Sequence, residues 1–296
     1  MTIYSQLWGD INTASSRLRV LNIQPHIKNY LIGSPEETPT YDMSNYKSGY
    51  KKGDVLIIQK MPLYDEMKKA QKDGCKVIYD IDDDYVDKEE FKKMIDEADL
   101  VTVDTEEKKK LIPKSIVIPD SLDWDGTIKE KYENKGIIGW TGYSNGTPYL
   151  NDIEIPEGMK LRLITDPKWV YLYKDQMAQS RPWSIEMVDK YLSECDLGIY
   201  YLPGERFDSV KGMHKLLKNF AIGLPTYTSP MPDYIKAFEE AGLGQKYIVR
   251  TQEGWSKINP IPDYDDIDKM RAYALKYKPE NIAKLWEKVI KDVLHT

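Results

Sequence analysis

The sequence has few of the residues that build disulfide frameworks or metal centres. Only two cysteines, Cys75 and Cys195, occur in 296 residues, far apart and in apolar surroundings. We therefore expect both to be reduced core residues, because this arrangement fits neither a disulfide framework nor a metal site. The three histidines, His26, His214 and His295, show no metal-ligand spacing.

Long hydrophobic runs are also missing. No apolar run approaches the ~20 residues that span a bilayer, and residues 1–10 lack the basic and apolar regions of a signal peptide. No low-complexity tract and no Gly/Ser-rich linker interrupts the chain. These absences predict a cytoplasmic protein without a membrane span.

An excess of positive charge is the third absence. The chain has 42 Lys and Arg against 48 Asp and Glu, which gives a net charge of −6 and a sequence pI of about 5.3. Proteins that hold duplex DNA usually carry a basic surface, so strong nonspecific binding to nucleic acid is not expected. A local basic groove stays open, because net charge averages over all faces of a protein.

The sequence contains a regular alternation of expected strands and helices, which indicates βαβ units and parallel sheets. Short apolar runs predict strands at 54–59, 75–80, 99–103, 115–119, 137–140, 159–164, 197–201 and 225–228. Helical spacing and capping residues predict helices at 64–72, 88–97, 105–110, 184–193, 211–222 and 279–294. The expected fold class is therefore α/β.

A polar, turn-rich segment at 132–136 divides this pattern into two halves. A chain of 296 residues is long enough for two domains of ordinary size. We expect a first Rossmann-like domain at 1–133, completed by the C-terminal helix 281–296, and a second at 134–280.

Two lysines open the expected helix 211–222. Lys211 and Lys215 are one helical turn apart, so both ammonium groups could reach one phosphate-bearing ligand. In open α/β sheets ligands bind beyond the carboxyl ends of the strands, where a helix N-terminus attracts anions. The alternative is a solvated basic face on an amphipathic helix.

Hydroxyl residues and arginines at 13–20 follow a segment that could be the first strand. Arg17 and Arg19 could hold a phosphate or carboxylate through bidentate contacts. The alternative is a helix N-terminus with Ser16 as its cap and Arg17 in solvent.

Four carboxylates lie within five residues at the end of the expected strand 75–80: Asp80, Asp82, Asp83 and Asp84. They could bind a divalent cation or cap the next helix. They could also supply a general base for an acceptor hydroxyl. We favour the general base and name Asp82 and Asp83 as catalytic candidates.

A glycine-containing turn follows the expected strand 137–140. Glycine after a strand lets backbone N–H groups approach a diphosphate. Gly142 is therefore a candidate for binding a diphosphate.

Taken in order, these segments resemble the family-four glycosyltransferases of the GT-B fold. The first matching segment is Ser-x-Arg-x-Arg at Ser15, Arg17 and Arg19. The others are Tyr-Asp-(apolar)-Asp-Asp at 79–83, Gly-Trp-x-Gly at 139–142, and the block 196–229. The resemblance implies two Rossmann-like domains facing across a cleft, with the C-terminal helix crossing back to the first domain and Trp286 anchoring it. It also implies that a nucleotide diphosphate sugar is held by Gly142, Lys211, Lys215, Arg17 and Arg19. Lys218, in the same helix, is a further donor-binding candidate.

The sequence departs from the family pattern in the donor helix. Lys218 stands where the family has a glutamate that accepts hydrogen bonds from the donor ribose, and an ammonium group cannot accept them. The acidic partner expected eight residues earlier falls on Val210. Glu205 and Asp208 are the nearest candidates for contacting the donor sugar, and Glu205 is our third catalytic candidate.

The resulting prediction is a glycosyltransferase that moves a sugar from a nucleotide diphosphate donor to an acceptor hydroxyl, retains the anomeric configuration and needs no divalent metal. Three alternatives remain. The Asp run could indicate a GT-A enzyme with a bound divalent cation. The acceptor could be a hydroxymethylated pyrimidine in DNA, since small GT-B enzymes of some viruses modify such bases and the composition is compatible with a phage genome. The chain could also be a non-enzymatic nucleotide-sugar binder, because Lys218 and Val210 replace expected acids.

Overall fold

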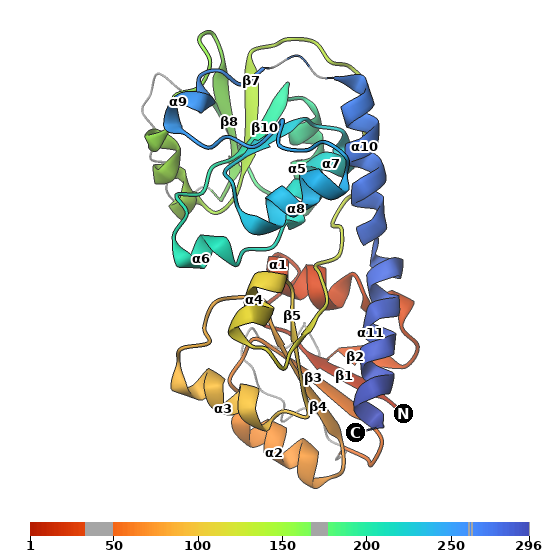
Figure 1. The fold of residues 1–296 in the computed structure, drawn as a ribbon. Coiled ribbons are helices and arrows are strands. Elements are labelled where there is room, and N and C mark those ends of the chain that lie inside the picture. Colours follow the sequence, from red (N-terminus) through yellow and green to blue (C-terminus); the bar gives the residue numbers. More distant parts are fainter. Residues whose placement is uncertain (33–49, 167–176, 260, 262, 296) are drawn as a thin grey trace. The chain divides into compact units, whose positions relative to one another are not determined.

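The computed structural model describes residues 1–32, 50–166, 177–259, 261 and 263–295. The chain forms two compact units (Figure 1). Unit 1 comprises Met1–Asp123, Val210–Gly212 and Tyr277–Thr296, and unit 2 comprises Trp124–Ser209 and Met213–Lys276. Each unit has its own parallel sheet, as the alternation of strands and helices predicts.

Unit 1 is built on a six-stranded sheet in the order β2-β1-β3-β4-β5-β6, in which all neighbouring strands are parallel. The central strand β3 reads Val-Leu-Ile-Ile-Gln and is buried throughout, as expected for a strand covered on both faces. The strands are β1 (Ile3–Gln6), β2 (Tyr30–Ile32), β3 (Val55–Gln59), β4 (Lys76–Ile81), β5 (Leu100–Val103) and β6 (Ile116–Val117).

Helices cover both faces of this sheet (Figure 1). On one face, α2 (Tyr64–Lys72) and α3 (Glu89–Glu97) bury Met67, Phe91 and Met94 against the strands. On the other face, α11 (Pro279–Leu294) buries Trp286 in a second core. The C-terminal helix therefore packs on the first sheet, as predicted. The short elements are α1 (Ala14–Ser16), the π-helical turn η1 (Arg17–Leu21), η2 (Gln24–His26) and α4 (Glu106–Leu111).

Unit 2 is built on a five-stranded parallel sheet in the order β11-β10-β7-β8-β9. Its strands are β7 (Ile137–Thr141), β8 (Lys160–Thr165), β9 (Met177–Pro182), β10 (Leu197–Tyr200) and β11 (Thr226–Thr228). Its helical elements are η4 (Ser144–Asp152), α5 (Ile185–Ser193), α6 (Arg206–Ser209), α7 (His214–Ile222), α8 (Pro232–Glu240), α9 (Gln252–Trp255), α10 (Tyr264–Ala274) and η5 (Leu275–Tyr277), the last of which ends in unit 1.

Helix α7 packs on its neighbours through aromatic contacts. The ring of Phe220 lies 5.4 Å from that of Phe238 on α8 and 6.4 Å from that of Tyr273 on α10, both edge to face. Gly223, in the left-handed conformation, ends the helix. Tyr200, the last residue of β10, donates a hydrogen bond to the carbonyl of Lys215 in the first turn of α7.

Unit 2 begins at Trp124, before the polar segment 132–136 at which we predicted the domain boundary. Lys129 Nζ donates hydrogen bonds to the carbonyls of Ser193 and Cys195. Tyr132 donates one to the carbonyl of Gly223. These contacts bring the segment from Trp124 onward into unit 2.

No helix in the described ranges is long and apolar enough to cross a membrane. Both cysteines are buried thiols, as expected. Burial raises the pKa of each to about 12.

Candidate functional site

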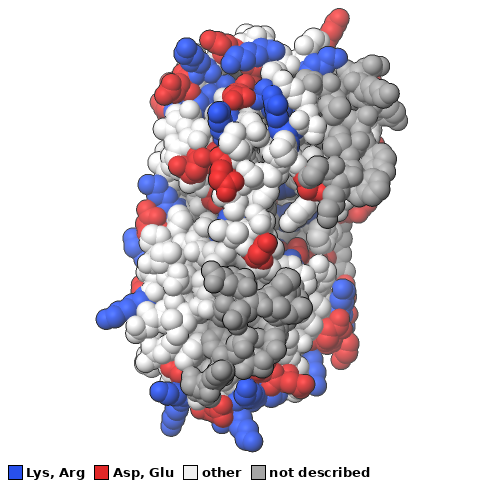
Figure 2. Space-filling model, turned by 180° about the vertical axis from the view of Figure 1, so that it is seen from behind, with Lys and Arg blue, Asp and Glu red and all other residues white. Residues whose placement is uncertain are grey.

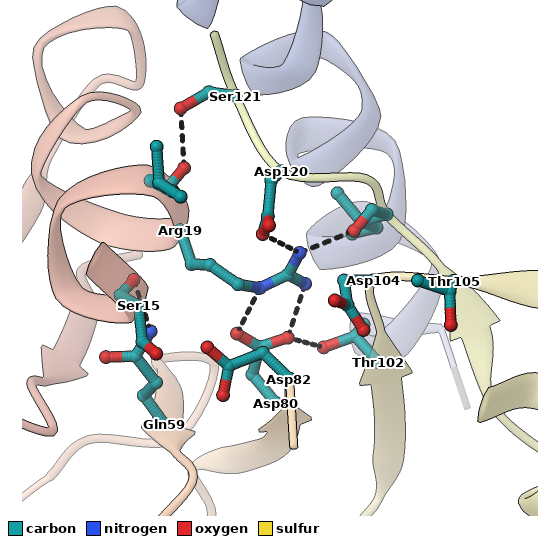
Figure 3. Close-up of polar contacts among 12 residues, drawn as sticks. Ser15, Arg19, Gln59, Asp80, Asp82, Thr102, Asp104, Thr105, Asp120 and Ser121 are labelled. Atoms are coloured by element: carbon teal, nitrogen blue, oxygen red, sulfur yellow. Dashed lines mark hydrogen bonds and ion pairs between the residues drawn. The ribbon is translucent and has the colours of Figure 1, made fainter. Parts of the chain in front are cut away.

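The carboxyl edge of the unit 1 sheet carries a network of charged side chains (Figure 3). Arg19 extends from η1 to Asp80 at the end of β4. Its Nε and Nη2 donate hydrogen bonds of 2.8 and 2.6 Å to the two carboxylate oxygens of Asp80. Its Nη1 donates to the carbonyl of Ile118 at 2.6 Å and to Asp120 at 3.3 Å. Thr102 on β5 also donates to Asp80.

Burial decides what Arg19 can do. Its side chain is 0% exposed, and its guanidinium also lies 5.6 Å from the ring of Trp286. Burial would lower the pKa of Arg19, but Asp80 outweighs it and the pKa is raised. The predicted contact of Arg19 with a donor needs correction, because every polar atom of the group faces protein. Arg19 joins η1 to β4.

Arg17, the other arginine predicted to contact a donor, is also buried and hydrogen-bonded to protein groups. Its Nε donates to Asp123 at 2.9 Å, and its Nη1 donates to the carbonyl of Ile11 at 2.7 Å, with 8% of the side chain exposed. The adjacent hydroxyl residues serve the same loop. Ser16 Oγ accepts the N–H of Gly9, and the carbonyl of Ser15 accepts from Gln59 (Figure 3). The Ser-x-Arg-x-Arg segment thus orders the loop after β1.

Asp82 and Asp83 follow β4 and face Lys60, the first residue after β3. Lys60 Nζ pairs with Asp83 Oδ2 and lies 3.7 Å from Asp82 Oδ1. Asp82 Oδ1 is buried and has no hydrogen-bond partner among the described residues. The carbonyl of Asp82 accepts a 2.6 Å hydrogen bond from Lys108. A buried carboxylate oxygen that accepts no hydrogen bond is ready to accept one from a hydroxyl.

Asp104, after β5, completes this edge. Its Oδ1 accepts a 2.5 Å hydrogen bond from Lys108. Burial raises its pKa to about 8, with Lys108 opposing the shift and Asp120 adding to it. The chain comes close here: a methyl group on Gly212 would lie 3.0 Å from Asp104 Oδ2 and 3.3 Å from Asp120 Oδ2. Thr105 also donates to the carbonyl of Val210.

That contact places Lys211 in unit 1, between Val210 and Gly212. Helix α7 begins only at His214. The prediction that Lys211 and Lys215 share one helical face is therefore wrong, because the three residues 210–212 pack on unit 1 instead of extending the helix.

In unit 2, Gly142 and Lys215 meet at the end of β7. A methyl group added to Gly142 would lie 2.8 Å from the indole of Trp140 and 3.1 Å from Lys215 Nζ. A side chain at position 142 would therefore displace the Trp140 ring and shift the Lys215 ammonium, which lies beside Gly142. The next turn is held by Asp166, which accepts hydrogen bonds from the N–H and the hydroxyl of Ser144. The N–H of Ser144 is the main reason that the pKa of Asp166 is lowered.

Lys218 does not face this point. Its Nζ donates a 2.6 Å hydrogen bond to Asp189 on α5, and the Asp189 side chain is 1% exposed. The other oxygen of Asp189 accepts the N–H of Asp125. Burial raises the pKa of Asp189, and Lys218 opposes this. The donor contact predicted for Lys218 is corrected, because its ammonium neutralises a buried carboxylate.

Glu205 and Asp208 lie around α6. Glu205 is exposed, whereas Asp208 is buried and its N–H donates to the carbonyl of Glu205. The catalytic role of Glu205 stays a prediction.

Lys60, Asp104, Asp120 and Asp189 were not predicted from the sequence. Three of them were open to a simple rule. Lys60, Asp104 and Asp120 each come directly after an expected strand, and the carboxyl ends of parallel strands meet at one edge. Asp189 gave no such signal, because it lies within a helix.

No protein-family model and no curated protein sequence matches the chain. Solved structures do. The pneumococcal O-GlcNAc transferase GtfA, in complex with UDP and GlcNAc, aligns with 83% of this chain at 13% identity and a TM-score of 0.59, and the chain spans only 58% of its length.

Two further structures align over nearly the whole of both chains. The DNA modifying enzyme beta-glucosyltransferase, studied with and without uridine diphosphoglucose, has a TM-score of 0.60 at 11% identity and 100% coverage of each chain. S. aureus MnaA with UDP has a TM-score of 0.59 at 11% identity, over 100% of this chain and 97% of its own. These similarities confirm the predicted α/β fold of the GT-B type.

Proposed function

We propose that this protein transfers a sugar from a uridine diphosphate sugar to an acceptor hydroxyl. One observation carries the proposal: the ammonium of Lys215 lies against the backbone of Gly142 at the carboxyl edge of the unit 2 sheet. Ligands of open α/β sheets bind at this edge. Two structures with the same fold were determined with UDP, which supports the choice of nucleotide.

We assign donor binding to unit 2 and acceptor activation to unit 1. In the reaction, the acceptor oxygen bonds to the anomeric carbon on the face from which the diphosphate departs. The bond from that carbon to the diphosphate oxygen breaks at the same time, so the configuration is retained. The leaving UDP gains negative charge, which Lys215 stabilises. The acceptor hydroxyl loses its proton to Asp82 Oδ1, the buried oxygen without a hydrogen-bond partner in the described residues.

We also propose that no divalent metal takes part. The carboxylates of Asp80 and Asp83 are already neutralised by Arg19 and Lys60. Within the described ranges, no three His, Cys, Asp or Glu side chains are assembled as a metal site. The resemblance to family-four enzymes favours retention of configuration, which the coupling constant of the product's anomeric proton reports.

Thermal-shift screening against a panel of nucleotide sugars tests donor binding, since a ligand at 100 times its Kd stabilises by about 2.7 kcal/mol. Transfer from each stabilising donor to a panel of hydroxyl acceptors is then followed by mass spectrometry. Lys215→Ala should weaken UDP binding by at least about tenfold, because a hydrogen bond to a charged group contributes ~1.5–3 kcal/mol. Donor binding without transfer or donor hydrolysis would identify a nucleotide-sugar binder instead.

A second candidate concerns the acceptor. The alignment with the DNA modifying beta-glucosyltransferase covers both chains completely, which favours a hydroxymethylated pyrimidine in DNA. On the face shown in Figure 2, Lys and Arg are interspersed with Asp and Glu, so recognition would depend on the base more than on general attraction to phosphates. Comparing transfer to hydroxymethylated and unmodified duplexes decides between this acceptor and a small molecule.

A further inference from the structure

Lys60 has an unusual backbone for a lysine. Its φ is +62°, in the left-handed region that residues with a side chain rarely adopt. The conformation is held from both sides: its N–H donates to the carbonyl of Asp80 at 2.8 Å, and its carbonyl accepts from the hydroxyl of Tyr79 at 3.2 Å. Strained residues held by their surroundings concentrate at functional sites.

The strained backbone directs the Lys60 ammonium to the two predicted catalytic carboxylates. Its side chain is 8% exposed, pairs with Asp83, and lies 3.7 Å from Asp82 Oδ1. Two aromatic rings flank it, Trp8 at 5.1 Å and Tyr85 at 5.8 Å. Burial would lower the pKa of Lys60, but Asp82 and Asp83 outweigh it and the pKa is raised. Lys60 therefore stays charged at neutral pH.

The distribution of contacts leaves one position open. Asp83 takes the short contact with Lys60, so Asp82 Oδ1 remains buried without a hydrogen-bond partner in the described chain. Lys108 also holds Asp82, but it donates its hydrogen bond to the backbone carbonyl of Asp82 and not to the carboxylate. The missing partner is a hydrogen-bond donor.

We propose that Lys60 is a positioning residue of the acceptor site, holding Asp82 and Asp83 so that Asp82 Oδ1 receives the hydroxyl of an uncharged acceptor group. The inference rests on the proposed sugar transfer and names the chemistry of its acceptor. The single ammonium of Lys60 faces the two carboxylates of Asp82 and Asp83, so the net charge around Asp82 Oδ1 is negative. A negative net charge disfavours an anionic acceptor group at this position.

The test compares Lys60→Met, which removes the charge, with Lys60→Arg, which keeps it. Lys88→Met is the matched control, because Lys88 Nζ lies 4.6 Å from the same Tyr85 ring but on an exposed residue. Each variant is measured for melting temperature, UDP affinity, and kcat and acceptor KM across pH.

The pH profile separates positioning from folding. Within the described residues, the charged and titratable groups around Asp82 include Lys60, Lys108, Asp83, Asp104, Tyr79 and Tyr85. Lys60→Met removes the cation that faces Asp82 and Asp83, so the acid limb of kcat/KM should move to higher pH. Lys60→Arg should keep the wild-type limb even if its melting temperature falls.

We expect Lys60→Met to lower kcat/KM for the acceptor at least about tenfold, with UDP affinity and the Lys88→Met control unchanged. An unshifted acid limb, with activity lost only in proportion to folded protein, overturns the positioning role and leaves sugar transfer intact. Faster transfer to an anionic than to a neutral acceptor overturns the acceptor class. A wild-type protein that transfers no sugar overturns both this inference and the proposed function.

Discussion

Lys218 and Asp189 form a buried ion pair, with 2.6 Å between Lys218 Nζ and Asp189 Oδ1. The pair joins α7 to α5. Asp189 also accepts the N–H of Asp125, near the start of unit 2. Lys218, which replaces the glutamate of the family pattern, therefore pairs with a buried carboxylate of its own unit.

Lys218→Glu should accordingly destabilise unit 2 more than it changes donor binding. The substitution places two carboxylates together at a site where Asp189 is 1% exposed. Breaking a buried pair costs about 3–5 kcal/mol of the free energy of unfolding, which urea titration measures. Lys190→Glu, on an exposed position of α5, is the control and should change stability by less than ~0.5 kcal/mol. An unchanged stability with altered UDP affinity would show that Lys218 contacts the donor, as the sequence predicts.

Gly142→Ala should weaken UDP binding at least about tenfold, or ~1.4 kcal/mol, with the fold retained. The added methyl group must displace the Trp140 ring or the Lys215 ammonium, which would lie 2.8 and 3.1 Å away. Gly146→Ala is the matched control, since its methyl group meets the same ring at 3.4 Å, an ordinary contact. Calorimetric titration with UDP compares the two. Equal affinities would remove Gly142 and Lys215 from the donor site.

Asp104 should make the protein less stable as pH rises. Its pKa is raised from 3.8 to about 8, chiefly by burial. Between these values the folded protein holds a proton that the unfolded chain has lost, so the free energy of unfolding falls with increasing pH. Asp104→Asn should flatten this part of the stability–pH curve.

Urea titrations across that window measure the effect. Asp96→Asn is the control, because the Asp96 side chain is 74% exposed. Parallel curves for wild type and Asp104→Asn would show that Asp104 titrates at its ordinary pKa.

Sugar transfer should survive EDTA, because Asp80 and Asp83 are already paired with Arg19 and Lys60 and no three His, Cys, Asp or Glu side chains of the described residues are assembled as a metal site. Asp82→Asn should lower kcat by about 10²–10⁴-fold, the usual contribution of a general base, with UDP affinity unchanged. Loss of transfer in EDTA and its recovery with manganese would favour the metal reading of the Asp run. A matching loss of stability in Asp82→Asn would indicate a helix-capping role.

Local sequence determined the secondary structure well. The buried run at 54–59 is β3 (Val55–Gln59), and the predicted helix 64–72 is α2 with the same bounds. Strand 75–80 is β4 (Lys76–Ile81). Such elements follow from apolar periodicity and caps, which are properties of neighbouring residues. The order of the motifs was also enough to predict the GT-B fold.

Partners distant in sequence were decided by tertiary structure alone. Arg19 is 61 residues from Asp80, and Lys218 is 29 from Asp189. A charged residue in sequence looks the same whether it meets a ligand or a buried carboxylate. The sequence predicts a helix from residue 211, yet residues 210–212 pack beside Asp104 and Thr105 and α7 begins only at His214. Periodicity reports which faces are apolar, whereas charge pairing depends on which strand ends and helices the fold brings together.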